Sequence, residues 1–395
     1  MGPRSKKEYM ETIYLRYKRT KKRTEKSALI TELCATCGWH RKHAIRALKK
    51  FKRFTKPKPK KRGRPSIYNI SSVIEPLKRI WLAAGQPCSK LLKPTIKLWM
   101  PYYAQEFGAL PLSAIKALLK ISPATIDRIF KPIRIKYTKR GRSTTKPGTL
   151  LRKSIPIKTN QWEETHPGFL EADTVAHCGD TVAGMFVYTV NLVDIATGWT
   201  EQRAVWGKGE AGVLEQIKDV EARLPFPLKG FDCDNGGEFI NHHLIKHFGN
   251  KVKPVQFTRS RSYHKDDNAH VEQKNWTHVR QWFGYHRLEN RKIVPLMNTL
   301  YTTEWRLFHN FFCSSVKLIE KKRVASKTIK RYDKPKTPYQ RIIESKDVLP
   351  AQKQALEEQF TDLNPFRLRK AMEKKLQQIF NIHFGRRNSY PGLLR

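Results

Sequence analysis

The chain has 395 residues, 39% of them hydrophobic, so it is long and apolar enough to fold into several domains with buried cores. Its 78 Lys and Arg residues outnumber its 34 Asp and Glu residues, giving a formal net charge of +44. Such a charge opposes compaction unless an anionic partner neutralises it, so the class of nucleic-acid-binding proteins is favoured. No membrane partner is expected, because no apolar run approaches membrane length.

The distribution of charge, the cysteine content and the apolar runs further restrict the classes of protein that the sequence allows. Residues 1–161 contain 41 basic and 7 acidic residues, whereas residues 162–285 contain 17 of the 34 acidic ones. This distribution predicts a central enzyme core between nucleic-acid-binding segments; a solvated, ribosomal-type basic protein would not require it. Six cysteines at irregular spacing, no signal-like opening segment and no membrane-length apolar run predict a cytoplasmic protein.

Residues 1–53 are predicted to form a helix-turn-helix DNA-binding domain. Apolar residues recur at helical spacing over 26–36 and 39–50, and Gly38 separates the two segments. The second segment carries three candidate DNA contacts: Arg41, Lys42 and Arg46. A small helical bundle with a solvated basic face is the alternative.

A zinc site is a weaker possibility in the same domain. The four candidate ligands follow one another at steps of three residues: Cys34, Cys37, His40 and His43. On one helix such steps spread over about half the circumference and do not converge on a tetrahedron.

Residues 54–65 form a predicted basic linker, in which Arg62 and Arg64 belong to an RGRP sequence similar to the AT-hook core.

Residues 66–135 are predicted to be a second helix-turn-helix-like domain, with helices over 111–120 and from the N-cap Ser122 onward. Its candidate DNA contacts are Thr125, Arg128 and Lys131. Simple helix packing is the alternative. Residues 136–161 form another basic linker.

Residues 162–285 are predicted to be an α/β core. Alternating or apolar runs predict strands over 169–175, 184–194, 199–206, 228–233 and 253–257. Helical spacing covers 210–224, 239–248 and 268–283. The resulting order is βββαβαβα, a mixed sheet of the ribonuclease H-like kind. Residues 286–395 are predicted to be mainly helical, serving packing, DNA binding or subunit contact.

Three acidic residues stand at separate places in this core: Asp173 in the first strand, Asp234 at the end of the fourth, and Glu272 in the last helix. Carboxylates gathered from separate elements repel one another, and a fold that does this usually holds divalent cations. Two Mg²⁺ or Mn²⁺ ions are the expected cofactors, since a pair of metals promotes in-line attack at phosphodiesters. Competing acids are Asp232 above all, and also Asp194, Glu171 and Asp267, while His177 and His270 flank the site.

The motifs DNGGEFIN at 234–241 and KDDNAHVEQKN at 265–275, with an acid in the first strand, resemble the integrase-type core of DDE transposases and retroviral integrases. Three further features look most similar to bacterial insertion-sequence transposases: FLEADTVAHCG at 169–179, the two predicted helix-turn-helix units, and KPKTPYQRIIES at 334–345. The resemblance implies that Asp173, Asp234 and Glu272 are the catalytic, metal-binding triad.

The function expected from this resemblance is DNA transposition: hydrolysis at transposon ends and strand transfer into target DNA, by a homo-oligomer associated with the bacterial nucleoid. Further DNA contacts are expected around the last helix: Arg259, Lys265, Asn268, Lys274 and Asn275. A DNA-binding regulator with an idle core, and a ribonuclease H-like nuclease that cleaves without joining, are the alternatives.

Overall fold

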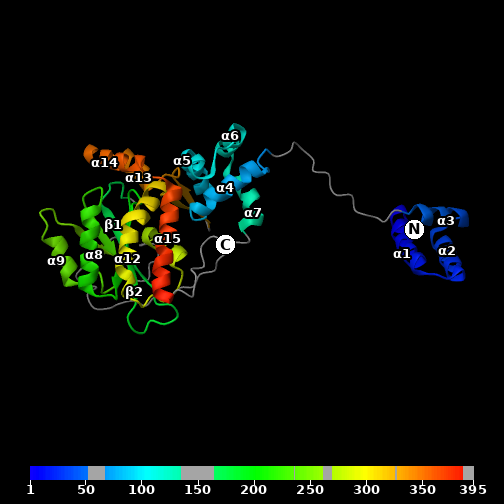
Figure 1. Ribbon diagram of the computed structural model, residues 1–395, viewed down its shortest axis with the longest axis horizontal. Coiled ribbons are helices and arrows are strands. Elements are labelled where there is room, and N and C mark those ends of the chain that lie inside the picture. The colour runs from blue at the N-terminus through cyan, green and yellow to red at the C-terminus, as the bar shows by residue number, and fades with distance from the viewer. Residues whose placement is uncertain (52–66, 135–163, 235, 261–268, 325–326, 386–395) are drawn as a thin grey trace. The chain divides into compact units, whose positions relative to one another are not determined.

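A computed structural model describes residues 1–51, 67–134, 164–234, 236–260, 269–324 and 327–385 (Figure 1). The chain divides into two compact units, Met1–Ser66 and Ile67–Arg395. The predicted linkers 54–65 and 136–161 lie outside the described residues. So do four of the candidate contacts: Arg62, Arg64, Lys265 and Asn268.

The described residues of the first unit, 1–51, contain three helices: α1 (Pro3–Arg19), α2 (Arg23–Cys37) and α3 (Arg41–Lys50). The two predicted helices are therefore present, and Gly38 ends α2 with φ of +64°, a left-handed conformation that glycine adopts without strain. Two of the four possible zinc ligands have other roles. Cys37 is buried in the core of this unit, and the His40 ring accepts a hydrogen bond from the Lys42 amide at the start of α3.

The second unit contains a five-stranded mixed sheet in the order β3-β2-β1-β4-β5. Its strands are β1 (Phe169–Ala176), β2 (Val187–Asp194), β3 (Thr200–Trp206), β4 (Gly230–Cys233) and β5 (Gln256–Arg259). The first three pair antiparallel, while β4 is parallel to β1 and β5 is parallel to β4. The predicted mixed sheet is confirmed. The fifth strand starts later than predicted, because its ladder with β4 begins at Gln256 opposite Gly230.

Two helices connect the strands of the sheet, α8 (Glu210–Arg223) and α9 (His242–Gly249). The segment after β5 is one continuous helix in three parts: α10 (Ala269–Lys274), the π-helical η3 (Asn275–Arg280) and α11 (Gln281–Phe283). A π-helical turn shifts the side chains that follow it around the helix axis and often occurs at functional sites. Here the shift comes directly after Lys274.

The edge strand β3 is covered by the following helical segments: α12 (Ile293–Leu300), η4 (Tyr301–Trp305) and η5 (Phe308–Phe312). Asn298 exchanges two hydrogen bonds with the backbone of Ala204, of 2.6 and 2.9 Å. Asn310 does the same with Thr200, both at 2.9 Å. These amides satisfy backbone groups that an open sheet edge would leave unpaired.

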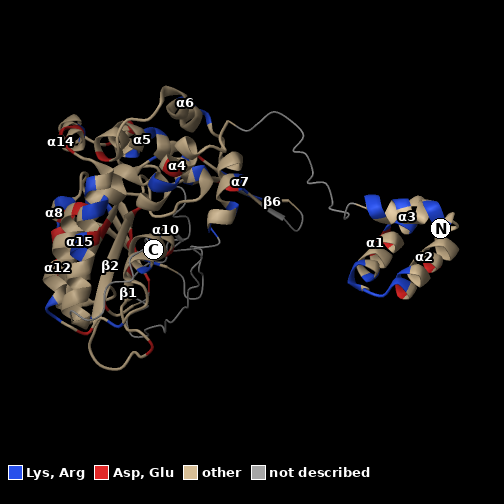
Figure 2. Cartoon of the chain, turned by 45° about the vertical axis from the view of Figure 1, so that its right-hand side comes forward, with Lys and Arg blue, Asp and Glu red and all other residues tan. Residues whose placement is uncertain are grey.

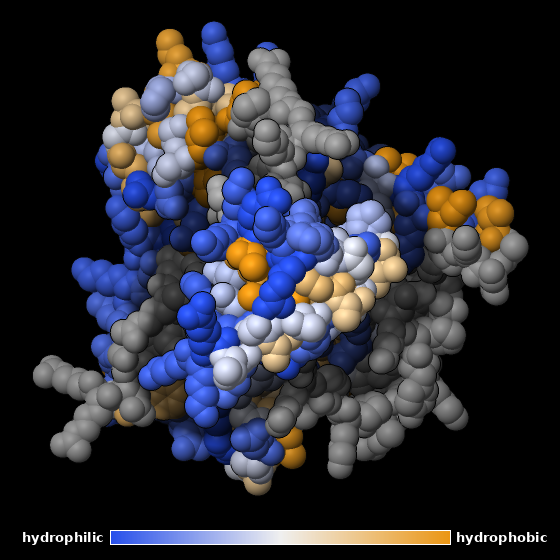
Figure 3. Space-filling view, turned by 90° about the vertical axis from the view of Figure 1, so that its right-hand side faces the viewer, coloured by the Kyte–Doolittle hydropathy of each residue, from blue (hydrophilic) through white to orange (hydrophobic). Residues whose placement is uncertain are grey.

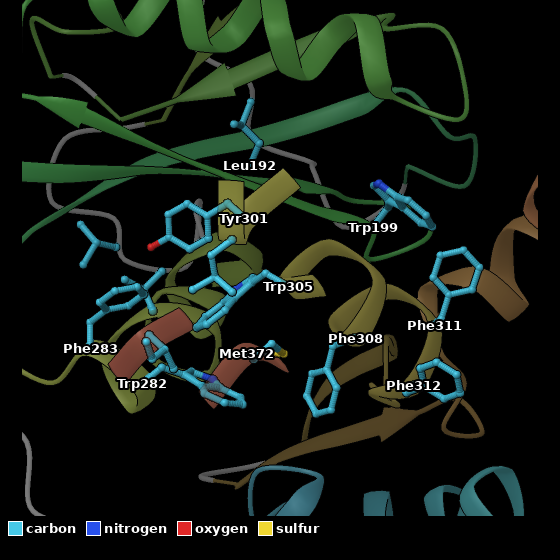
Figure 4. Close-up of a cluster of buried hydrophobic side chains, with 14 of the residues drawn as sticks. Leu192, Trp199, Trp282, Phe283, Tyr301, Trp305, Phe308, Phe311, Phe312 and Met372 are labelled. Atoms are coloured by element: carbon cyan, nitrogen blue, oxygen red, sulfur yellow. The ribbon is translucent and has the colours of Figure 1, made fainter. Parts of the chain in front are cut away.

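An aromatic cluster joins the covering helices to the C-terminal ones (Figure 4). It brings together Trp282, Tyr301, Trp305 and Phe308, with Met372 from α15. The C-terminal helices are α13 (Pro338–Glu344), α14 (Pro350–Thr361) and α15 (Pro365–Phe384). In this region the amphipathic helices expected over 350–384 are present, and their apolar faces serve packing.

Residues 67–134 belong to the same hydrophobic core. Their helices are α4 (Ser71–Ala83), α5 (Ser89–Phe107), α6 (Leu112–Lys120) and α7 (Pro123–Arg134). Trp99 of α5 is fully buried, its ring packs edge-on against Phe308 and Phe366, and its Nε1 donates to the Phe312 carbonyl at 3.2 Å. The predicted N-cap of α7 is also present, since the Thr125 amide donates to Ser122 Oγ at 3.2 Å.

The C-terminal region also contains a β-hairpin that the helical prediction missed: β6 (Leu318–Val324) and β7 (Lys327–Tyr332). The β-branched residues among its basic side chains favour strand.

The face of the protein drawn in Figure 3 is mostly hydrophilic, with hydrophobic side chains in small separate patches. None of the helices in the described ranges has the length and apolar character needed to cross a bilayer.

Candidate active site

Two of the three predicted acids, Asp173 and Asp234, meet at one end of the sheet. Asp173 lies on β1 and Asp234 directly follows β4, and the parallel register places Ala172 opposite Cys233, one position before each acid. Burial raises the pKa of Asp173 to about 7, and the neighbouring charge of Asp234 contributes to this rise. The two carboxylates are therefore close enough for the charge of Asp234 to oppose ionisation of Asp173.

A third carboxylate, Glu238, joins this pair from the turn after β4. A methyl group placed on Gly236 would lie 2.6 Å from Glu238 Oε2 and 2.9 Å from Asp234 Oδ1, so both carboxylates lie against this glycine and a larger residue there would displace them. Burial raises the pKa of Asp234, and the charge of Glu238 adds to the rise. Lys208 Nζ lies 2.8 Å from Glu238 Oε1, and although burial alone would lower the pKa of Lys208, Glu238 raises it.

Asp173 is held in place by a chain of side-chain amides. Asn275 Nδ2 donates to Asp173 Oδ2 at 2.5 Å, and Asn191 Nδ2 donates to Asn275 Oδ1 at 2.8 Å. Gln202 Nε2 in turn donates to Asn191 Oδ1 at 2.8 Å. Strand pairing places Asp173, Asn191 and Gln202 opposite one another on β1, β2 and β3. Asn275 therefore positions Asp173.

The third predicted acid, Glu272, is exposed on α10. Its charge contributes to the raised pKa of Glu171, which lies two positions before Asp173 on the same face of β1. Among the described residues, no group of three or more His, Cys, Asp or Glu side chains is arranged to hold a metal ion. In chemical type, the oxygen donors of Asp173 and Asp234 do fit a divalent cation.

Glu171 is a buried acid on β1, the strand that also carries Asp173. Its Oε2 accepts hydrogen bonds from the amides of His270 and Val271 at the start of α10, of 3.1 and 3.0 Å, while its buried Oε1 has no hydrogen-bond partner within the described part of the chain. Burial raises the pKa of Glu171 to about 8, against the lowering effect of the Val271 amide. Glu171 thus anchors the helix that carries Glu272.

The raised pKa of Glu171 predicts how stability depends on pH. The folded protein binds the Glu171 proton more tightly than the unfolded chain does, so its stabilising contribution is full below the unfolded pKa and is lost as pH rises to about 8. We expect the free energy of unfolding, measured with urea in EDTA, to fall between pH 5 and 8 by on the order of 2 kcal/mol. Glu171→Gln should make this slope shallower, and the part that remains comes from other acids with raised pKa values, such as Asp173. The exposed control Glu215→Gln should keep the wild-type slope, and an unchanged slope in Glu171→Gln would refute the assignment.

Several competing residues have structural roles. Asp194 accepts from the Gly168 amide and from Thr197, which fixes the turn between β2 and β3. Asp232 is buried and accepts from Thr258 Oγ1. Burial lowers the pKa of His177 to about 3 and that of His270 to about 4, so both rings are neutral at pH 7. Asp267 lies outside the described residues.

The candidate DNA contacts differ in how far their side chains are exposed. Arg41, Lys42, Arg46, Arg128 and Lys131 are exposed, and Thr125 and Arg259 are partly exposed. Lys274 lines a cavity of about 400 Å³, and burial lowers its pKa to about 8. Asn275 uses its amide within the protein, as described above.

Sequence reasoning did not identify Glu238, Lys208, Asn191 or Gln202. A signal was present for two of them: Asn191 and Gln202 interrupt apolar strands, and a buried polar side chain there needs a partner. Glu238 follows Asp234 by four residues in the DNGGE turn. Nothing local connects Lys208 to this turn, because the two are joined only through the tertiary fold.

The second unit is thus a mixed α/β protein with a paired-carboxylate site at one end of its sheet. No model of a protein family matches the sequence. The chain is 36% identical over 337 residues to the "Uncharacterized protein y4rM" of Sinorhizobium fredii (strain NBRC 101917 / NGR234), covering 85% of this chain and 94% of that protein. The chain belongs to the same family as y4rM.

Among solved structures, the catalytic core domain of BIV integrase gives a match with a TM-score of 0.29 and 13% identity, covering 49% of this chain and 98% of that one. A TM-score this low does not establish a shared fold.

Proposed function

We propose that this protein is a DDE-type DNA transposase, a polynucleotidyl transferase that binds the ends of a mobile DNA element, cleaves them and joins them to target DNA. The observation that supports this most strongly is the pairing of Asp173 with Asp234 within the one acidic segment of a strongly basic chain. The charge of Asp234 raises the pKa of the partly buried Asp173, and acids held together at such a cost to the stability of the fold are typical of active sites. The proposed core architecture is ribonuclease H-like.

Asp173 and Asp234 would hold Mg²⁺ or Mn²⁺, with Glu272 as the proposed third ligand. Two such ions, when bound, would activate water or a DNA 3′-hydroxyl and stabilise the leaving oxygen of the phosphodiester. The protein's own residues orient these ligands: Asn275 fixes the Asp173 carboxylate, and Lys208 balances the charge of Glu238 beside Asp234. No covalent protein nucleophile is required.

Binding of double-stranded DNA is proposed for two helical segments, with helix-turn-helix roles for α2–α3 and α6–α7. The proposed contacts among the described residues are Arg41, Lys42, Arg46, Thr125, Arg128, Lys131, Arg259 and Lys274. Cations on one helix neutralise phosphates and position neighbouring side chains over base edges. A homo-oligomer is proposed because two transposon ends must be held together.

The proposal is tested by incubating purified protein and Mg²⁺ with labelled duplex DNA that carries the sequences flanking its gene. Joined products on a denaturing gel are the expected result. Cleavage without joining would favour a ribonuclease H-like nuclease. Binding without either would favour a regulator with an idle core, and both of these outcomes would overturn transposition.

The hydrogen bond from Asn275 to Asp173 leads to a separate prediction. Asn275→Ala should reduce turnover roughly 10–100-fold, the range seen when the support of a metal ligand is removed, with little change in DNA affinity. Asn250→Ala, an exposed asparagine after α9, is the matched control. Gel-shift titration and single-turnover kinetics separate the two quantities. Weakened DNA binding with normal turnover would instead make Asn275 a DNA contact.

A further inference from the structure

The hairpin β6–β7 forms a two-stranded sheet of its own. Every side chain that the structure describes between 319 and 332 is exposed. This includes four large apolar ones: Ile319 (69% exposed), Val324 (48%), Ile329 (50%) and Tyr332 (51%). Figure 2 shows β6 extending away from the helices of its unit. A two-stranded ribbon alone is only marginally stable in water, so we expect another molecule to cover its apolar side chains.

The base of the hairpin is fixed to the rest of the unit. The Lys317 amide donates to Asp333 Oδ1 at 2.6 Å, and the Asp333 amide donates to the Lys317 carbonyl at 2.9 Å. Arg341 forms an ion pair with Asp333, and Lys317 Nζ donates to the Ala196 carbonyl at 2.7 Å. These contacts set the direction in which the hairpin leaves the body, so it is a positioned arm and not a free tether.

The composition of the arm indicates its partner. Residues 318–332 contain six Lys or Arg residues and one acid, Glu320, which pairs with Arg331 at 3.5 Å. Strand pairing places Lys322 opposite Ile329 and Glu320 opposite Arg331, so these four residues share one face. That face combines cations with an apolar side chain, and the opposite face carries Lys330. Such a surface is complementary to a polyanion.

We propose that the arm β6–β7 binds duplex DNA as a β-ribbon, with the face that carries Val324 and Ile329 against base edges, and with Lys322, Lys330 and Arg331 on phosphates. The major groove is wide enough for a two-stranded ribbon, and apolar side chains contact thymine methyl groups there. A second copy of this chain fits less well, because two ribbons of the same positive charge repel each other. The inference rests on the proposed function insofar as both require DNA.

The test uses the full chain with Lys322→Ala, Lys330→Ala and Arg331→Ala combined, and measures duplex affinity against salt concentration. Each phosphate contact contributes about 0.9 to the slope of log K against log salt, so the slope should fall by roughly 1–3. The matched control removes three exposed lysines elsewhere, Lys218, Lys253 and Lys374, and should leave the slope unchanged. The melting temperature should be unaffected, because exposed ion pairs contribute little to stability.

The outcomes separate the arm from the proposed function. If wild-type protein binds and joins DNA while the arm variant keeps the wild-type slope, or loses no more than the control, the arm is not a DNA contact and transposition stands. If the arm variant changes sedimentation and not DNA affinity, the arm is a contact between subunits and the inference fails. If wild-type protein shows no salt-dependent binding to duplex DNA, both proposals are wrong.

Discussion

Asp234→Asn is expected to abolish DNA cleavage and joining while the protein stays folded. Replacing residues that only support a metal ligand costs roughly 10–100-fold, so loss of a ligand carboxylate should exceed a 100-fold reduction in rate. The amide oxygen of Asn can still accept the hydrogen bond that the Gly236 amide donates to Asp234 Oδ1 at 2.9 Å, so the turn is preserved. The variant therefore removes the negative charge of Asp234 and preserves the geometry of the turn.

The same variant should be more stable than the wild type in EDTA. Burial and the charge of Glu238 raise the pKa of Asp234, which means that its ionised form destabilises the fold. We expect the melting temperature at pH 7.5 to rise by roughly 2 °C or more. Asp180→Asn, at an exposed position, is the control for both measurements. Normal product formation by Asp234→Asn would refute the site, and a lower melting temperature would refute the electrostatic account of it.

Trp99→Ala should destabilise the whole second unit. The side chain is fully buried between α5 and the aromatic residues Phe308, Phe312 and Phe366. Removing a buried aromatic side chain typically costs about 3–5 kcal/mol, through lost transfer energy and the remaining cavity. In urea unfolding, the transition of the second unit should coincide when followed by tryptophan fluorescence and by circular dichroism, and should shift to lower urea.

The coincidence of the two signals is the informative part of this experiment. The sequence predicted residues 66–135 as a domain of their own, whereas Trp99 links them to a shared core. Trp276→Ala, at a site that is 40% exposed, should cost far less. Two separate transitions, with only the first displaced by Trp99→Ala, would establish 66–135 as an independent domain.

Local sequence signals predicted most of the elements. Period-two alternation marked β1, Gly38 ended α2, and Ser122 with Pro123 started α7, because strand pleating, left-handed glycine and N-capping are determined by a few adjacent residues. The fifth strand and the hairpin β6–β7 were harder to predict. Short strands with many charged residues carry little periodicity, and their boundaries depend on which partner strand supplies the hydrogen bonds.

The sequence by itself determined the charge pattern and the mixed α/β order of elements, since these follow from residue type and local spacing. It also predicted Asp173 and Asp234 as members of an acidic triad. Only the tertiary structure decided which side chains surround them. It brought Glu238 and Lys208 to Asp234, made Asn275 a support for Asp173, and placed Glu272 on an exposed face of α10. Contacts of this kind join residues far apart in the chain, and they depend on strand register and helix rotation, which local sequence does not encode.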